Sequence, residues 1–190
     1  MKRKILFLSI LAICVATLAA GSLAYFTAED TAHNVITSGG IDIELLEWAD
    51  EERKEEFPSS GVTGVLPGAQ ITKIVEVKNI GANEAWIRVE AVKDITLADG
   101  IEGDVDLGLM LLDFDTEKWT EKDGYYYYNE PLAPGETTTP LFASVTFDVK
   151  MDNRYQNSTA TVDVLAQAVQ TANNGKTVLE AQGWPVENQQ

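Results

Sequence analysis

Apolar and polar residues alternate with a period of two along much of the chain. In residues 141–150 every odd-numbered position is apolar, and every even-numbered position except Phe142 is polar. Residues 161–170 and 85–92 show the same alternation. Because successive side chains of a β-strand point to opposite faces, this period predicts half-buried strands.

Apolar, β-branched and aromatic residues predict further strands. They are concentrated in five more segments: 35–37, 41–46, 71–78, 105–114 and 124–128. Turn residues separate the segments, for example Leu66-Pro67-Gly68 and Ala133-Pro134-Gly135. Proline and glycine favour the two central positions of a type II turn, so these phrases indicate tight connections between strands.

Helical signals are few. Residues 176–182 contain good helix formers and are followed by Gly183 and Pro185, which predicts one short helix. The charged segment 50–60 is expected to form a loop or a second short helix. The chain is therefore predicted to be all-β: a single jelly-roll-like β-sandwich with one or two short helices, preceded by an N-terminal signal-peptide helix.

The N-terminus has the features of a secretory signal peptide. The cationic run Lys2-Arg3-Lys4 precedes residues 5–26, which carry no charge. Ser22 and Ala24 place small residues where a signal peptidase needs them for cleavage between Ala24 and Tyr25. The apolar stretch is also long enough for an uncleaved membrane anchor, and a third alternative is a lipoprotein signal at Cys14. We predict cleavage, so that the membrane is contacted only through an uncleaved signal.

The expected organisation has four parts. Residues 1–24 are the signal peptide, 25–38 a free N-terminal segment, 39–185 the sandwich domain and 186–190 a polar tail. Cleavage would remove Cys14, the single cysteine, so the mature chain would hold neither disulfide nor thiolate. The net charge of −16 disfavours nucleic acid as a partner, because such a surface repels phosphates. The predicted location is extracellular or on the cell surface.

The residues needed for common hydrolytic mechanisms are missing from the sequence. His33 is the single histidine, whereas a His-Glu-x-x-His zinc site needs two. The sequence also has no Gly-x-Ser-x-Gly motif around a serine nucleophile. We therefore predict that the chain is not an enzyme and needs no cofactor.

Two groups of residues are candidates for ligand binding. Asp113, Asp115 and Glu117 alternate, so they would share one face of a strand and could contact calcium; the alternative is that they are solvated surface acids. The tyrosines at 125–128, together with Trp119, could form a flat surface for a sugar ring. The alternative is that they fill the core and rim of a strand.

Several short motifs resemble the TasA and camelysin family, whose signal peptides depend on the signal peptidase SipW. The N-terminal part of the resemblance consists of Lys2-Arg3-Lys4-Ile5 to Leu23-Ala24-Tyr25-Phe26-Thr27, then Asp30-Thr31-Ala32 and Ile41-Asp42-Ile43-Glu44-Leu45. Similar phrases downstream are Leu66-Pro67-Gly68, Val77-Lys78-Asn79-Ile80-Gly81, Ala85-Trp86-Ile87-Arg88-Val89 and Ala166-Gln167-Ala168-Val169-Gln170. The resemblance covers most of the chain, but residues 94–130 are not diagnostic.

The resemblance implies a jelly-roll sandwich, export through a SipW-type signal peptidase, and a structural role in biofilm-matrix or cell-surface fibres. In fibre-forming relatives the N-terminal segment is added as a strand to the next subunit, so Tyr25, Phe26, Val35 and Ile36 are candidate donor-strand residues. The expected partners are further copies of the chain, the signal peptidase and an accessory fibre protein. The alternative is that residues 25–38 fold back onto their own sandwich or stay disordered.

Two other functions stay open at this point. One is a monomeric extracellular binding module for glycan or calcium, using the acidic or aromatic residues described above. The other is a camelysin-like extracellular metallopeptidase, a label that some relatives carry. This sequence offers no zinc ligands to support that label.

Overall fold

Eleven β-strands and three short 3-10 turns make up the secondary structure of the described residues. The computed structural model describes four stretches of the chain: residues 35–37, 40–59, 62–63 and 67–185. All four belong to one compact unit, residues 33–190, whereas the expected signal-peptide helix lies outside the described residues. Within the four stretches, no helix has the length and hydrophobicity that crossing a membrane requires.

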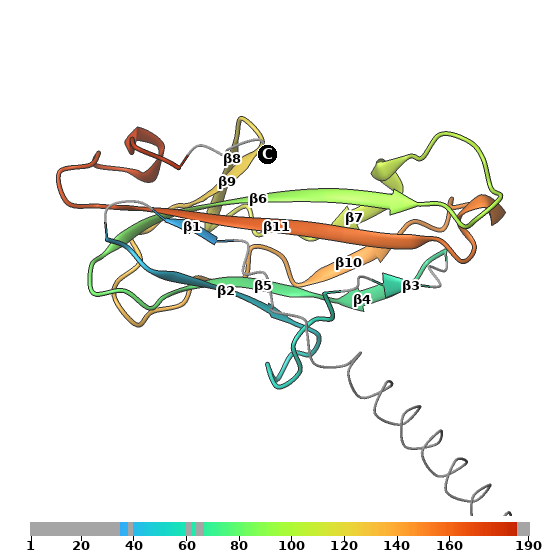
Figure 1. Ribbon diagram of the computed structural model, residues 1–190, viewed down its shortest axis with the longest axis horizontal. Coiled ribbons are helices and arrows are strands. Elements are labelled where there is room, and N and C mark those ends of the chain that lie inside the picture. The colour runs from blue at the N-terminus through green and yellow to red at the C-terminus, as the bar shows by residue number, and fades with distance from the viewer. Residues whose placement is uncertain (1–34, 38–39, 60–61, 64–66, 186–190) are drawn as a thin grey trace, which may run out of the picture. The chain divides into compact units, whose positions relative to one another are not determined.

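The first layer is a six-stranded sheet built around two long strands (Figure 1). β6 (Ala85–Thr96) and β11 (Thr159–Gln170) pair antiparallel over all twelve of their residues. β9 (Tyr125–Tyr128) pairs with β6, and β8 (Trp119–Lys122) pairs with β9. The opposite edge of β11 carries two short strands, β1 (Val35–Thr37) and β3 (Val62–Thr63).

The second layer contains two smaller sheets. One pairs β2 (Ile43–Trp48) antiparallel with β5 (Ile74–Asn79). The other has the order β4 (Gln70–Thr72), β10 (Ser144–Phe147) and β7 (Met110–Leu112).

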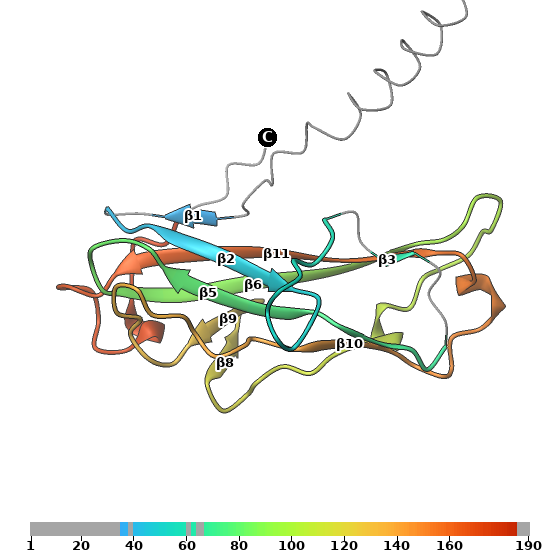
Figure 2. The same ribbon diagram turned by 90° about the horizontal axis from the view of Figure 1, so that it is seen from below.

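Residues 136–143 join the two smaller sheets. The Leu141 amide donates a hydrogen bond to the Val75 carbonyl at 2.8 Å, and the Val75 amide donates to the Phe142 carbonyl at 3.1 Å. Since this extended segment pairs with β5 and continues into β10, the strands β2, β5, β10 and β7 belong to one layer. Figure 2 shows β5 and β10 in this arrangement.

The core lies between the layers and consists of the inward-facing residues of each strand. Ile87 and Val89 of β6 are fully buried, as is Val75 of β5. Phe142 is 1% exposed and meets Phe114 edge to face, with ring centroids 5.6 Å apart. Burial of alternate residues on facing sheets is what holds a sandwich together.

The predicted fold class is confirmed, because the described residues form an all-β sandwich. Strands occur within each of the segments that alternate or are rich in strand formers: 35–37, 41–46, 71–78, 85–92, 124–128, 141–150 and 161–170. Their bounds differ from the prediction by a few residues. The strands β3 and β8 were not predicted, because neither is long enough to show an alternating pattern.

The strand predicted at 105–114 is wrong over most of its length. Leu107–Leu109 form a 3-10 turn, and only β7 follows it. Asp106 caps this turn, since its side chain accepts a hydrogen bond from the Gly108 amide at 2.9 Å. An aspartate that bonds the backbone two residues later competes with strand pairing.

The helix predicted at 176–182 is reduced to one 3-10 turn, Val178–Glu180. Tertiary hydrogen bonds determine the conformation of this segment, because the Asn174 side chain donates to the carbonyl of Gln170 and also bonds the backbone of Gln182 in both directions. Residues 50–60, expected to be a loop or a short helix, form a turn whose last residues fold back along β2.

Replacement of Phe142 by alanine tests the packing between the layers. We expect Phe142→Ala to lower the free energy of unfolding by about 3–5 kcal/mol, because it leaves a cavity beside Phe114. The measurement is urea unfolding followed by tryptophan fluorescence. Val149→Ala is the control, since Val149 is 76% exposed and its truncation should change stability by less than about 0.5 kcal/mol. Equal losses in the two variants would contradict the layer assignment.

Candidate functional site

The short strand β1 occupies part of the outer edge of β11. Residues 35–37 pair in parallel with residues 166–168. All other strand pairs of the described residues are antiparallel. Parallel pairing is slightly less stable per residue, and only three residues take part here, so β1 is the least firmly paired of the long sheet's strands that face β11.

A gap lies beside β1 on the same edge. β3 pairs with Thr159 and Ala160 at the other end of β11. Residues 161–165, between these two short strands, pair with β6 on one side and with no described strand on the other. The backbone N–H and C=O groups of an uncovered edge are available to another strand.

Few contacts hold β1 to the sandwich. Val35 is half-buried and packs against the core, and β1 also contacts β2 (Figure 2). Gly40 follows with a φ of 72°, and no atom lies within 4 Å of the position that its Cβ would take. Glycine adopts this left-handed conformation without strain, so the chain can change direction between β1 and β2.

Several predicted site residues lie outside the described residues: Ala24, Tyr25 and Phe26, together with Cys14 and His33. Cleavage after Ala24 and the first half of the donor-strand prediction therefore stay predictions. Val35 and Ile36 lie in β1, as the sequence predicted for a strand. In this structure β1 pairs with its own sandwich, which is one of the arrangements that the sequence left open.

The carboxylates considered for calcium are engaged by the backbone. Asp113 accepts hydrogen bonds from the amides of Ala143 at 2.9 Å and Ser144 at 2.7 Å. Asp115 accepts one from the Glu117 amide at 3.0 Å. Among the described residues, no three His, Cys, Asp or Glu side chains are grouped so that they could hold a metal ion. The geometry gives Asp113 and Asp115 a structural task, which is to fix turns.

Trp119 and the tyrosine run do not form one flat surface. Trp119 is 2% exposed and packs against Tyr128, with ring centroids 5.0 Å apart. Tyr126 stacks on Phe114 at 4.2 Å, and its burial, followed by the nearby Glu121 carboxylate, raises its pKa. These aromatic rings fill the core side of β8 and β9.

Tyr125 and Tyr127 belong instead to a cluster on the outer face of the six-stranded sheet. The Arg88 guanidinium lies 3.9 Å from the ring centroid of Tyr125 and 4.7 Å from that of Trp184. Its Nε–H donates to Gln167 Oε1 at 2.7 Å. Stacking between two rings and a hydrogen bond fix this cation, so the cluster attaches the C-terminal segment to the sheet.

The sequence analysis did not find this outer cluster, although part of its signal was present. Trp86 and Arg88 occupy even positions of the 85–92 alternation, which marks them as facing away from the core. No local pattern shows that Trp184, almost a hundred residues later, covers that face.

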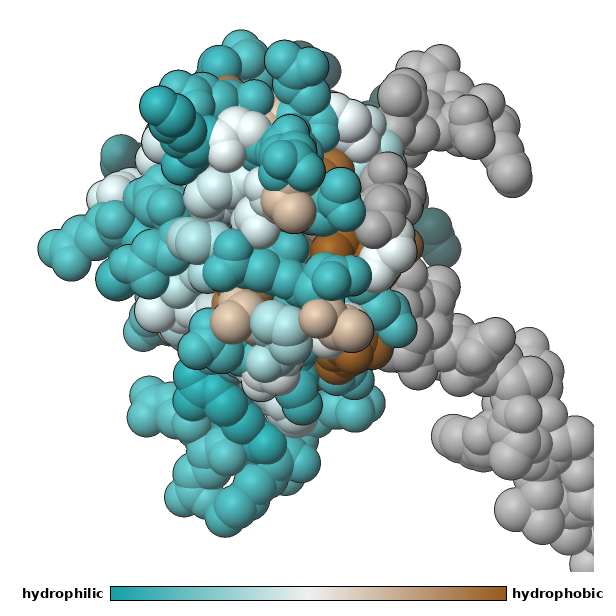
Figure 3. All heavy atoms as spheres, turned by 90° about the vertical axis from the view of Figure 1, so that its left-hand side faces the viewer, coloured by the Kyte–Doolittle hydropathy of each residue, from teal (hydrophilic) through white to brown (hydrophobic). Residues whose placement is uncertain are grey.

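Large apolar side chains are scattered over the described surface rather than gathered in one patch: Ile80, Val92, Ile101, Leu111, Val149 and Leu179 are exposed. Figure 3 shows one end of the unit, where hydrophilic residues surround small apolar areas. Broad apolar patches usually mark interfaces between apolar faces. The candidate for association is therefore a strand edge, the outer edge of β11.

Comparison with known proteins gives no match. Neither family models, nor curated proteins, nor solved structures match the chain. The resemblance to the TasA and camelysin family therefore stays a prediction from sequence motifs, and the function has to be argued from the geometry.

Truncation of Asp113 tests its structural task. We expect Asp113→Ala to lower the free energy of unfolding by about 1 kcal/mol, because two backbone amides lose a charged acceptor. Unfolding by urea should give the same loss with calcium and with a chelator. A stabilisation of the unsubstituted protein by calcium that Asp113→Ala removes would instead show a metal site.

Replacement of Trp184 tests the outer cluster. Trp184→Ala removes the ring over Arg88 and should release the C-terminal segment, so that the Gln182 amide, which donates to Asn174 Oδ1 at 2.8 Å, exchanges its hydrogen faster. A loss of stability of about 1 kcal/mol is expected from the lost cation–π contact. Trp184→Phe keeps an aromatic ring and is the control. Unchanged exchange at Gln182 in Trp184→Ala would contradict this assignment.

Proposed function

We propose that this protein is a secreted structural subunit that assembles into surface or matrix fibres by strand addition. The observation that carries the proposal is the outer edge of β11, where a three-residue parallel strand lies beside a stretch, residues 161–165, that no described strand covers. Self-association through backbone pairing needs such an edge and a segment able to fill it.

The same pairing can form within one copy or between two. In the structure, residues 35–37 pair with residues 166–168 of their own chain. If β1 of one copy takes this place on the next copy, every hydrogen bond of the pair is replaced by an equivalent one. Exchange of an identical element therefore costs little once the linker at Gly40 allows it.

Exchange of β1 in one direction produces a fibre rather than a closed pair. The donated strand and the accepting edge of β11 are different surfaces, so each copy both gives and receives. Such a heterologous contact continues indefinitely unless its rotation closes a ring. Residues that precede β1, among them Tyr25 and Phe26, would extend along residues 161–165 and fill the gap.

Export fits this function. Removal of residues 1–24 by a SipW-type signal peptidase creates the free N-terminal segment, and an uncleaved chain would keep that segment tied to the membrane. An accessory fibre protein would start or anchor the fibre. The acidic surface, with a net charge of −16 for the whole chain, keeps unassembled copies apart through charge repulsion.

Deletion of residues 25–38 from the secreted protein is the direct test. We expect the purified wild type to form fibres in electron microscopy and the deletion variant to stay monomeric, because the donor segment is lost. Val35→Asp is a milder second variant, since it places a charge where Val35 packs against the core. It should abolish fibres while circular dichroism still shows a β-sandwich.

Removal of the polar tail, residues 186–190, is the matched control, because it shortens the chain at the other end without touching β1. Fibres formed by the chain that lacks residues 25–38 would disprove strand donation by this segment. A wild type that stays monomeric at all concentrations would disprove the fibre function.

A further inference from the structure

The outer edge of β2 is a second exposed strand edge, and part of it is covered by the chain itself. β2 pairs with β5 along its whole length. Trp48, the last residue of β2, is paired on both sides, with Ile74 of β5 on one and with Glu56 on the other. Residues 49–57 therefore form a hairpin that returns along the outer edge of β2; we call it the β2 hairpin.

Two backbone hydrogen bonds and a tight turn shape the β2 hairpin. The Phe57 amide donates to the Glu47 carbonyl at 2.9 Å, and the Ala49 amide donates to the Glu55 carbonyl at 2.8 Å. Asp50 closes the turn, since its side chain accepts hydrogen bonds from two hairpin amides, and the Glu55 amide is the main cause that lowers its pKa. Arg53 sits in the left-handed region with a φ of 55°.

An ion pair ties the turn of the hairpin to the middle of β5. Arg53 donates to Glu76 through two nitrogens: Nη2 lies 2.6 Å from Oε1, and Nε lies 3.0 Å from Oε2. The Glu76 side chain is only 6% exposed, whereas that of Arg53 is 43% exposed. The hydrogen bond to Glu76 raises the pKa of Arg53. A bidentate pair of this kind is directional as well as attractive.

A second cation holds the other arm of the hairpin. Lys73, 4% exposed, donates its Nζ–H to the carboxylate of Glu47 and lies 4.1 Å from the ring centroid of Phe57. Lys73 thus links the end of β2 to the returning arm. Two cations of an acidic chain are used to attach one hairpin.

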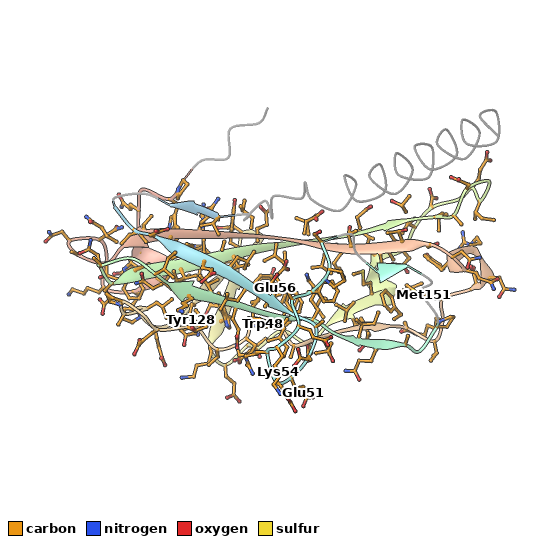
Figure 4. All side chains as sticks on the ribbon, turned by 60° about the horizontal axis from the view of Figure 1, so that its bottom comes forward. Trp48, Glu51, Lys54, Glu56, Tyr128 and Met151 are labelled. Carbon is orange, nitrogen blue, oxygen red and sulfur yellow. The ribbon has the colours of Figure 1, made fainter. Side chains whose placement is uncertain are left out.

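Apolar burial contributes little to this attachment. Residues 51–56 are all exposed, and Figure 4 shows Glu51, Lys54 and Glu56 with Trp48 at the end of β2. The hairpin depends on its ion pairs and backbone hydrogen bonds. Charged residues on a strand edge are a common way to prevent pairing with another chain, and Glu51, Glu52, Glu55 and Glu56 supply four carboxylates here.

We propose that the outer edge of β2 is a second surface for pairing with another copy of this chain, and that the β2 hairpin, attached through Arg53–Glu76 and Lys73–Glu47, keeps it closed. The inference rests on the proposed function, because a fibre that grows through β11 requires that the other edges do not pair. Residues 43–48 alternate Ile and Leu with Glu and end in Trp48, which is a strand-forming sequence once the edge is free.

The experiment neutralises the buried carboxylate in the secreted protein. Glu76→Gln keeps the size of the side chain but removes the charge that holds Arg53, so the hairpin should open more often. Hydrogen exchange of the Phe57 and Ala49 amides should become at least about tenfold faster, and sedimentation velocity should show oligomers that increase with concentration. Arg53→Gly is a second route to the same state, since glycine accepts the positive φ.

Two further variants make the result specific. Glu130→Gln is the matched control, because it neutralises an ion pair with Lys118 at 2.7 Å far from this edge; it should change neither readout. The double exchange Arg53→Glu with Glu76→Arg restores an ion pair and should restore slow exchange and remove the oligomers.

The same measurements in a chain lacking residues 25–38 separate this inference from the fibre function. Oligomers of Glu76→Gln that persist without residues 25–38 support pairing through β2, even if the wild type forms no fibres. Unchanged exchange at Phe57, faster exchange without oligomers, or oligomers that need residues 25–38 would each overturn the proposal, whether or not wild-type fibres form.

Discussion

The antiparallel pairing of β6 with β11 is the interaction on which the rest of the structure depends. Twelve residues of each strand pair without interruption, although the two strands are more than sixty residues apart in sequence. The inward side of this pair supplies fully buried residues such as Ile87 and Ala166 to the core. The outward side supplies Arg88 and Gln167, which attach the C-terminal segment.

A long central pair also determines which parts of the sandwich can move. β6 is paired on both sides, by β11 and β9, whereas the outer side of β11 has only β1 and β3. Loss of β1 would remove three residue pairs and leave the twelve of the central pair in place. An element can be exchanged between copies only if the remaining fold stays intact without it, and β1 meets this condition better than any longer strand.

The sequence predicts the fold where the pattern is local and long. The alternation in 85–92 and 161–170 is strong because one face of each strand packs on the core, and both predictions are confirmed by β6 and β11. It fails at 105–114, where the Asp106 side chain satisfies the Gly108 amide and a turn replaces the strand. It also fails at 176–182, since Asn174 and its tertiary hydrogen bonds, not helix propensity, set the conformation there.

The candidate site was predictable only in part, because an edge is a property of the assembled sheet. The sequence indicates that residues 35–37 form a strand, but it does not show that they pair in parallel with β11 or that residues 161–165 lack a partner beside them. The same holds for β2, whose end is covered by a segment that reads from sequence as a charged loop. The charges of residues 50–56 look like ordinary surface charges until Glu76 is seen to be buried and paired with Arg53. One edge with a short exchangeable strand and another closed by ion pairs is the arrangement that directs growth along a single axis.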